Sequence, residues 1–408
     1  MLQLVVVCVT SFVVWAGFGA ILPGLPVFLK EQAHASMNLI GVIAAAYYVG
    51  TFAFSWLLGR ASDTIGRKPM MVMGVCLYAV STLLFVTTTH PGWFTLFRLL
   101  EGVGAAAVGP ASQAFMADIT TDETRSRAYG WLTTAQFGGL IAGPALAAPV
   151  SALGGGGKWG FYAIFLFGSA LSALTAVALM ITVREPEHAR RRRQEKVKRP
   201  PYRELVTGPI AAFIIIAATS NFAMGAWEVV WSLWLRRLGA SMTYIYWTWI
   251  AFSVPMLLSF VGGYLADRYN RFALMFSGYA ISAAAWIMYG ATKNLTLFIT
   301  VNALEGVAVA YSYPAKQAFL VQVSPPRWLG AIQGLESTSM QLAALIGTLT
   351  APLMYQVMGG YVISLGGVLA IVGLAFTAPV LRREWASISA SGAAHPSAEA
   401  QALAERNV

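Results

Sequence analysis

The sequence predicts an all-α integral membrane fold in which twelve membrane-spanning helices form two related six-helix bundles. Three observations predict it: the composition, the recurrence of long apolar runs, and an internal repeat. Hydrophobic residues make up 57% of the 408 positions and charged residues only 11%, whereas a soluble domain carries roughly 25% charged residues. Lipid must therefore be the solvent for most of the surface, which excludes a water-soluble fold.

Apolar runs long enough to cross a bilayer recur along the chain. A spanning helix needs about 20 mainly apolar residues, and short polar segments separate twelve such runs. We predict spans at 2–29, 38–59, 69–89, 92–117, 127–150, 159–183, 207–235, 242–266, 272–291, 295–322, 328–356 and 361–381.

The positions of the basic residues predict the orientation, because loops rich in Lys and Arg stay cytoplasmic. Of the 27 Lys and Arg, two lie inside spans and most of the others lie in loops on one side. The opposite loops hold Lys30, Lys158, Arg236, Arg237 and Lys293. This bias predicts a multi-pass protein of the plasma (inner) membrane with both termini cytoplasmic.

One basic segment divides the spans six and six. Nine Lys or Arg lie between Arg184 and Arg203. We therefore predict an N-terminal bundle over 1–183, a linker over 184–206, a C-terminal bundle over 207–383 and a cytoplasmic tail over 384–408. Attraction to anionic membrane lipid explains the linker charge, so we expect no nucleic-acid partner.

An internal repeat relates the two bundles. Sliding the sequence against itself by 204 positions aligns LLEGVGAAAVGPASQAF with ALEGVAVAYSYPAKQAF, so that Glu101 meets Glu305. The same offset pairs Gly59 with Gly263. Two parallel repeats predict an axis along the membrane normal, a substrate site between the halves near the midplane, and alternating access.

The loop between the second and third spans resembles a signature of the major facilitator superfamily. It has the sequence GRASDTIGRK, and a degenerate copy runs from Gly263 to Arg271. The resemblance implies that this loop latches the cytoplasmic side of the outward-facing state, and that an acid after the fourth span pairs with its bases. The latch residues would be Gly59, Asp63, Gly66, Arg67 and Asp118.

Two further motifs resemble the twelve-helix drug:proton antiporters of that superfamily. The fifth predicted span carries the antiporter-like spacing Gly130, Gly139, Gly143 and Pro144, with Ala147 and Ala148 where paired glycines are usual. The fourth predicted span carries Arg98 and Glu101. In the family, glutamine is the usual residue at the position of Glu101. The resemblance favours export, although small residues also serve ordinary helix packing.

Five charged residues lie well inside predicted spans, where charge is costly and usually functional: Arg98, Glu101, Glu228, Glu305 and Lys316. Arg98 and Glu101 share one helix face, so they form either a structural pair or part of a site. Lys316 lies about 16 Å along its helix from Glu305, too far to pair with it. We therefore expect Lys316 to extend toward the membrane interface.

Proton coupling requires a carboxyl that can gain and lose a proton inside the membrane. The repeat counterpart of Arg98 is the uncharged Asn302, so desolvation should favour the neutral form of Glu305. We rank Glu305 first, Glu228 second and Glu101 third as proton-coupling candidates.

The resemblance places the first, fourth, seventh and tenth spans around a central cavity. The substrate-contact candidates on these spans are Trp15, Arg98, Gln113, Asn221, Trp227, Tyr311, Tyr313 and Gln317. Aromatic rings there can bind a lipophilic cation. Most aromatics of the seventh and eighth spans we interpret as an interfacial belt, namely Trp227, Trp231, Trp234, Tyr244, Tyr246, Trp247 and Trp249.

These features favour a secondary transporter over an enzyme. No phosphate-binding loop is present and no His lies within a span, so we expect neither ATP nor a metal site, and only the proton motive force as energy source. The leading hypothesis is a proton-coupled exporter of small amphiphilic or cationic compounds, acting as a monomer. A lipid or glycolipid translocase is the alternative, and a nutrient uptake symporter is third.

Overall fold

The structure is a computed structural model that describes residues 2–120, 122–185, 206–325 and 329–394. Its described part consists of helices and connecting loops, with no strand. The N-terminal half contains α1 (Leu2–Ile21), α2 (Leu25–Glu31), α3 (Met37–Thr64), α4 (Arg67–Leu84), α5 (Pro91–Ile119), α6 (Asp122–Leu153) and α7 (Gly157–Thr182).

The C-terminal half repeats this arrangement. It contains α10 (Gly208–Arg237), α11 (Met242–Met256), α12 (Ser259–Arg268), α13 (Arg271–Ala291), α14 (Leu295–Val323), α15 (Leu329–Met358) and α16 (Tyr361–Ala394). The helix α16 extends into the segment predicted as a tail. Most of the predicted linker, residues 186–205, lies outside the described residues.

Two of the twelve spans are each divided into two helices. The first consists of α1 and α2, with Pro23 at the break and Pro26 in the first turn of α2. The eighth consists of α11 and α12, which separate just after Pro255. Proline cannot donate a backbone hydrogen bond and clashes with the preceding turn, so both breaks have a cause in the sequence.

The helix boundaries follow the internal repeat. The helices α4 and α13 begin at Arg67 and Arg271, and α5 and α14 begin at Pro91 and Leu295. Both pairs therefore start 204 residues apart, as the sequence alignment predicts. The two six-helix halves are thus confirmed.

Nine helices or helix pairs among the described residues are long and apolar enough to cross a membrane by length and composition. The helices that complete the two bundles are α4, α5 and α15. Two of these three contain buried charges, because Arg98 and Glu101 lie on α5 and Glu336 lies on α15.

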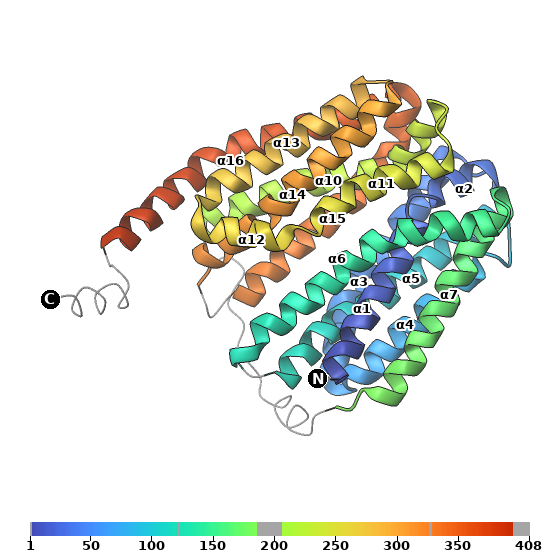
Figure 1. Ribbon diagram of the computed structural model, residues 1–408, viewed down its shortest axis with the longest axis horizontal. Coiled ribbons are helices and arrows are strands. Elements are labelled where there is room, and N and C mark those ends of the chain that lie inside the picture. The colour runs from blue at the N-terminus through green and yellow to red at the C-terminus, as the bar shows by residue number, and fades with distance from the viewer. Residues whose placement is uncertain (1, 121, 186–205, 326–328, 395–408) are drawn as a thin grey trace.

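The two halves lie side by side and meet along a seam (Figure 1). Across it α3 packs on α15, α6 on α11, and α10 on both α2 and α3. The ribbons of the halves approach each other at the end that carries α2 and are farther apart where α1 begins. We call these the α2 end and the Leu2 end.

Polar contacts join the halves at the α2 end. Arg236 at the end of α10 forms a 2.8 Å ion pair with Glu31 at the end of α2. Gln356 near the end of α15 donates a 2.9 Å hydrogen bond to Asn38 at the start of α3. The α2 end of the seam is therefore held closed by side chains from both halves.

Candidate functional site

A buried ion pair lies in the first half of α5. Arg98 Nη1 is 2.8 Å from Glu101 Oε2, and both side chains are almost completely buried. The other carboxylate oxygen of Glu101 accepts a 3.1 Å hydrogen bond from Thr82 on α4. The guanidinium of Arg98 lies over the ring of Tyr47 on α3, 4.7 Å from its centroid. The predicted pairing of Arg98 with Glu101 is thus present.

Glu228 lies at the seam between the halves. It is buried in α10, and its carboxylate accepts a short hydrogen bond from the Tyr48 hydroxyl on α3. Arg98 interacts with the Glu228 carboxylate electrostatically. Two predicted intramembrane charges, one from each half, therefore belong to one cluster.

Glu305 lies within the C-terminal half. It is buried in α14 and accepts a 2.8 Å hydrogen bond from the Tyr289 hydroxyl on α13. A side-chain hydrogen bond from Trp286 also reaches it. Asn302, the counterpart of Arg98, donates a 2.7 Å hydrogen bond to the Phe298 carbonyl. The hydrogen-bond partners of Glu305 among the described residues, Tyr289 and Trp286, are therefore uncharged.

Lys316 does not extend to the membrane interface, and that prediction is wrong. Its ammonium is buried and lies 2.6 Å from Glu336 Oε1 on α15. The Tyr313 ring is 5.3 Å from the ammonium. A carboxylate on a neighbouring span satisfies the charge inside the protein. Glu336 falls inside the predicted span 328–356, so its position was the available signal that sequence reasoning overlooked.

The aromatic residues of α10 and α11 are mostly interior. Trp227 and Trp249 pack with their ring centroids 4.7 Å apart, and Trp231 donates a hydrogen bond to Thr248. The belt interpretation is wrong for the buried members, which are Trp227, Trp231, Trp234, Tyr246 and Trp249. Trp247, 56% exposed, faces outward as a belt residue would. The sequence pattern did not separate the buried face of α11 from its exposed face, because both faces carry aromatic residues.

The remaining substrate-contact candidates contact different neighbours. Trp15 packs edge-on against Phe18. The Asn221 amide donates to a carbonyl of its own helix, while the Tyr311 hydroxyl pairs with Ser277 on α13. Gln113 is exposed and Gln317 is half-buried. Their role in binding stays a prediction.

Tyr313 is the candidate on α14 that reaches the other half. Its ring packs edge-on against Phe137 of α6, with centroids 5.6 Å apart. Because Tyr313 also lies beside Lys316, the buried Lys316–Glu336 pair is connected to the seam through one aromatic ring.

The loop between α3 and α4 is held by polar contacts within its own half. Gly66 has φ +132°, a conformation that favours glycine. Arg67 Nε is 3.4 Å from Asp118 on α5, and Arg67 Nη1 donates to Ser62. The backbone N–H of Lys68 donates 2.8 Å to Glu185, a residue the sequence reasoning missed.

Other latch residues are less informative. A Cβ added at Gly59 would lie 4.0 Å from Pro110, so packing alone does not require glycine there. The side chain of Asp63 lies outside the described part of the chain. The latch role of Gly59, Asp63, Gly66, Arg67 and Asp118 stays a prediction.

The antiporter-like glycines pack α6 directly on α1. A Cβ at Gly143 would lie 2.5 Å from the Ala16 carbonyl oxygen, and one at Gly139 would clash with the Phe12 carbonyl. Pro144 is buried in the same helix. Gly130 lies on α6, but its surroundings are outside the described residues. Close backbone packing therefore explains two of the motif positions.

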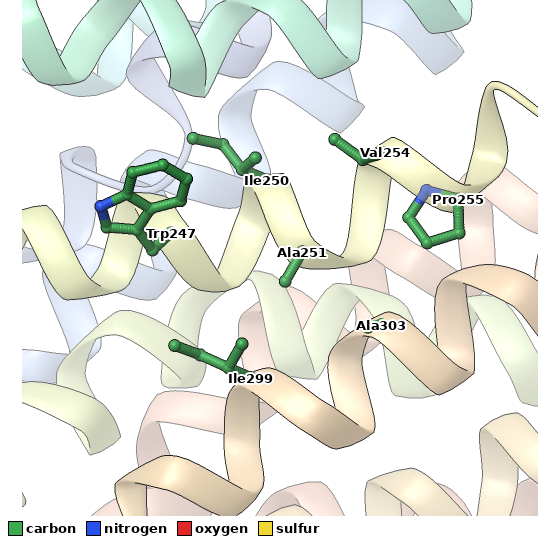
Figure 2. A pocket seen from close by; sticks show the side chains of 7 residues that line it. All are labelled: Trp247, Ile250, Ala251, Val254, Pro255, Ile299 and Ala303. Atoms are coloured by element: carbon green, nitrogen blue, oxygen red, sulfur yellow. The ribbon is translucent and has the colours of Figure 1, made fainter.

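A purely apolar pocket of about 370 Å³ lies between α11 and α14. Figure 2 shows Trp247, Ile250 and Val254 along one rim and Ile299 and Ala303 on the facing helix. A second apolar pocket of about 260 Å³ lies between α1 and α7. No charged residue lines either pocket, so both are separate from the buried carboxylates.

Comparison with known proteins identifies the family. The profile of the Major Facilitator Superfamily matches residues 7–254 and 229–404, which together cover nearly the whole chain. The chain belongs to the Major Facilitator Superfamily. It is accordingly a multi-pass membrane transporter for small molecules and not an enzyme.

Several relatives of this facilitator are named as drug-resistance proteins. The chain is 27% identical over 381 residues to Multidrug resistance protein 2 of Bacillus subtilis, covering 90% of this chain and 92% of the relative. It is 26% identical to the class B tetracycline resistance protein of Escherichia coli, covering 88% and 89%. The resemblance to drug:proton antiporters is thereby confirmed.

Solved structures confirm the facilitator fold. A bacterial homologue of the human lysosomal transporter Spinster, crystallised in an inward-facing and occupied conformation, superposes with a TM-score of 0.75 at 16% identity. The match covers 93% of this chain and 96% of that one. A D-xylose–proton symporter superposes with a TM-score of 0.73 at 15% identity. Such identities establish the fold alone.

Proposed function

We propose that this facilitator is a proton-coupled exporter of small amphiphilic or cationic compounds that works by alternating access. The names of its relatives support the substrate class, since several are multidrug or tetracycline resistance proteins. Buried carboxyls on the fourth, seventh and tenth spans support the coupling, because ionisable groups inside a membrane commonly form proton pathways.

The observation that carries the proposal is the position of Glu228. It is buried in the second half of α10, and its hydrogen bond to Tyr48 crosses the seam between the halves. A proton on Glu228 would weaken that bond, because bonds to an ionised carboxylate are roughly twice as strong as neutral ones. Protonation and the contact between the halves are therefore linked at one residue.

Glu305, ranked first from the sequence, is placed second in this proposal because its observed contacts do not cross the seam. Its carboxyl accepts hydrogen bonds from the neutral groups of Tyr289 and Trp286, so none of these partners opposes protonation with a positive charge. Its contacts lie inside one half, so a proton there would act on that half. Glu101 ranks third because its carboxylate is already compensated by Arg98.

The orientation proposed for the membrane has the Leu2 end in the cytoplasm. The basic linker between the halves supports this orientation, and we extend it to the plasma membrane with both termini cytoplasmic. The closed α2 end would then be extracellular and the arrangement inward-facing. We further propose that one chain suffices and that the proton motive force, without a bound cofactor, drives transport.

The test is collapse of an imposed pH gradient in liposomes that contain the purified protein. We expect lipophilic cations such as tetraphenylphosphonium to dissipate the gradient with wild type. Glu228→Gln should abolish the coupled flux, and Glu305→Gln should reduce it at least tenfold. Glu384→Gln is the matched control, because Glu384 lies on the terminal turns of α16 and should leave the flux unchanged.

The two variants test the roles of Glu228 and Glu305 independently. Undiminished flux in Glu228→Gln would remove that residue from the mechanism, and undiminished flux in both variants would overturn proton coupling through buried carboxyls. Absence of any cation-linked proton movement by wild type would overturn the export proposal itself.

One observation favours the alternative of a lipid or glycolipid translocase. The pocket between α11 and α14 is apolar and lies beside side chains that face the membrane, including Trp247 and Val254. A hydrocarbon chain fits such a lining better than a cation does. Movement of a fluorescent lipid between leaflets, measured in the same liposomes by dithionite quenching, would support translocation if no cation moves protons.

A further inference from the structure

Glu228 has two prospective partners on different helices of the N-terminal half. The Tyr48 hydroxyl on α3 donates to its carboxylate. Arg98 on α5 interacts with the same carboxylate electrostatically, while Arg98 Nη1 bonds to Glu101. The Glu228 carboxylate is therefore bound to α3 and attracted to α5.

Arg98 has unused donors on one side of its guanidinium. Its Nε and Nη2 atoms are fully buried and have no hydrogen-bond partner among the described residues. These two atoms form one edge of the planar group, and an arginine edge matches a carboxylate with two parallel hydrogen bonds. Buried donors without partners are unfavourable, so a conformation that supplies a carboxylate to this edge would relieve the cost.

Glu228 is the carboxylate available to that edge. Two carboxylates act on Arg98 electrostatically, Glu101 and Glu228. Glu101 already uses one oxygen for Arg98 Nη1 and the other for Thr82. Glu228 comes from the opposite half, so a relative movement of the halves changes its position against α5 while Glu101 stays on the same helix as Arg98.

We propose that Glu228 exchanges partners during the transport cycle, passing from the Tyr48 hydroxyl to the Nε–Nη2 edge of Arg98 when its carboxyl loses a proton to water. This inference rests on the proposed proton coupling at Glu228. Tyr48 and Arg98 are then positioning residues, each holding Glu228 in one of two arrangements.

The charge of Glu228 decides between the two arrangements. The titratable and charged groups that face it are Tyr47 and Tyr48 on α3 and Arg98 on α5. Protonation weakens the single bond from Tyr48, but it weakens pairing with the guanidinium more, because an ionised carboxyl would gain two charge-assisted hydrogen bonds there. The Arg98 arrangement therefore binds the proton less tightly, and rising pH populates it.

The exchange can be followed as a distance between α3 and α10. Nitroxide labels on cysteines at Thr64 and Thr207, which are exposed at the Leu2 ends of these helices, report it by pulsed electron resonance. The full-length protein, with Cys8 and Cys76 replaced by alanine, is measured in lipid nanodiscs between pH 5.5 and 9. Wild type should convert between two distance populations as the pH rises.

Two conservative substitutions should move the midpoint of that conversion in opposite directions. Tyr48→Phe removes the partner of the first arrangement, so the midpoint should fall by about one pH unit for a tenfold change in population. Arg98→Lys keeps the charge but removes the two-donor edge, so the midpoint should rise. Glu228→Gln should show one population at every pH.

Shifts in the same direction, or a distance that does not depend on pH, would overturn the exchange. If Arg98→Lys does not fold, Tyr48→Phe decides alone, since an unchanged or raised midpoint contradicts the proposal. Tyr264→Phe, on an exposed tyrosine of α12, is the control. Loss of coupling in Glu228→Gln liposomes without opposite midpoint shifts would refute only the exchange, whereas retained coupling would refute Glu228 as the proton site.

Discussion

The two halves share a helix arrangement, but the buried carboxyls at repeat-related positions, Glu101 and Glu305, have different partners. In the N-terminal half Glu101 is paired with Arg98 at 2.8 Å. In the C-terminal half the counterpart Glu305 bonds to Tyr289, and the counterpart of Arg98 is Asn302. The repeat therefore preserves the position of the carboxyl and changes its electrostatic environment.

The second buried cation, Lys316, lies in the C-terminal half and has no charged counterpart in the N-terminal half. Lys316 pairs with Glu336 in the C-terminal half, while the positions 204 residues earlier hold Ser112 and Leu132. Among the described residues, each half thus contains an almost fully buried ion pair, at positions that the repeat does not relate. The difference teaches that helix packing follows the repeat, whereas the partners of the buried charges do not.

The largest loss of stability should come from removing Arg98, the buried cation that has no counterpart in the C-terminal half. Arg98→Leu leaves Glu101 buried without its partner, which costs about 3–5 kcal/mol when a buried pair is broken. Asn302→Leu removes one amide hydrogen bond and should cost about 1 kcal/mol. Thermal unfolding in detergent, followed by tryptophan fluorescence, measures both.

A double variant sharpens this contrast. Arg98→Leu combined with Glu101→Leu replaces the whole pair by apolar groups, which is often close to neutral, so most of the lost stability should return. If the double variant is as unstable as Arg98→Leu alone, the loss comes from packing and the charge comparison between the halves is wrong.

A smaller and equal effect in both halves should follow from filling the glycine contacts. Gly143→Ala drives a methyl group against the Ala16 carbonyl, and Gly347→Ala drives one against the Phe222 carbonyl. Overpacking of this kind costs about 1–3 kcal/mol. Gly109→Ala, with open space around it, is the control. Clearly unequal losses at Gly143 and Gly347 would show that the halves do not share one packing plan.

The smallest effect should come from the ion pair between the halves at the α2 end. Arg236 and Glu31 are each more than one-third exposed, and such pairs contribute about 0–1 kcal/mol. Glu31→Gln should therefore leave the melting temperature almost unchanged in high salt, where screening has already weakened the pair. A large loss at every salt concentration would mean that this contact is a main connection between the halves.

The sequence predicted the fold well because its signals are periodic and physical. Apolar runs predicted the spans, and the Glu101–Glu305 alignment predicted a register that the helix starts confirm. The i, i+3 spacing of Arg98 and Glu101 predicted their contact, which stays within one helix turn. Features that depend on neighbouring residues of one helix were accessible from spacing alone.

Contacts between helices were not accessible in the same way. Nothing in the spacing connects Tyr48 with Glu228, which are 180 residues apart, or places Glu336 beside Lys316. The aromatic belt failed for a related reason, since Trp247 and Trp249 differ only in which side of α11 they occupy. Contacts between residues that are far apart in the chain cannot be recognised from the spacing of residues in a single sequence.

The glycine contacts between α1 and α6, and between α10 and α15, have a mechanical consequence. Where one backbone rests directly on another, no side chain lies between them to rotate aside or be compressed. Each of these helix pairs must move as a single solid piece. A turn of one half against the other along the seam would leave both helix pairs intact, whereas sliding α1 over α6 would disrupt one of them.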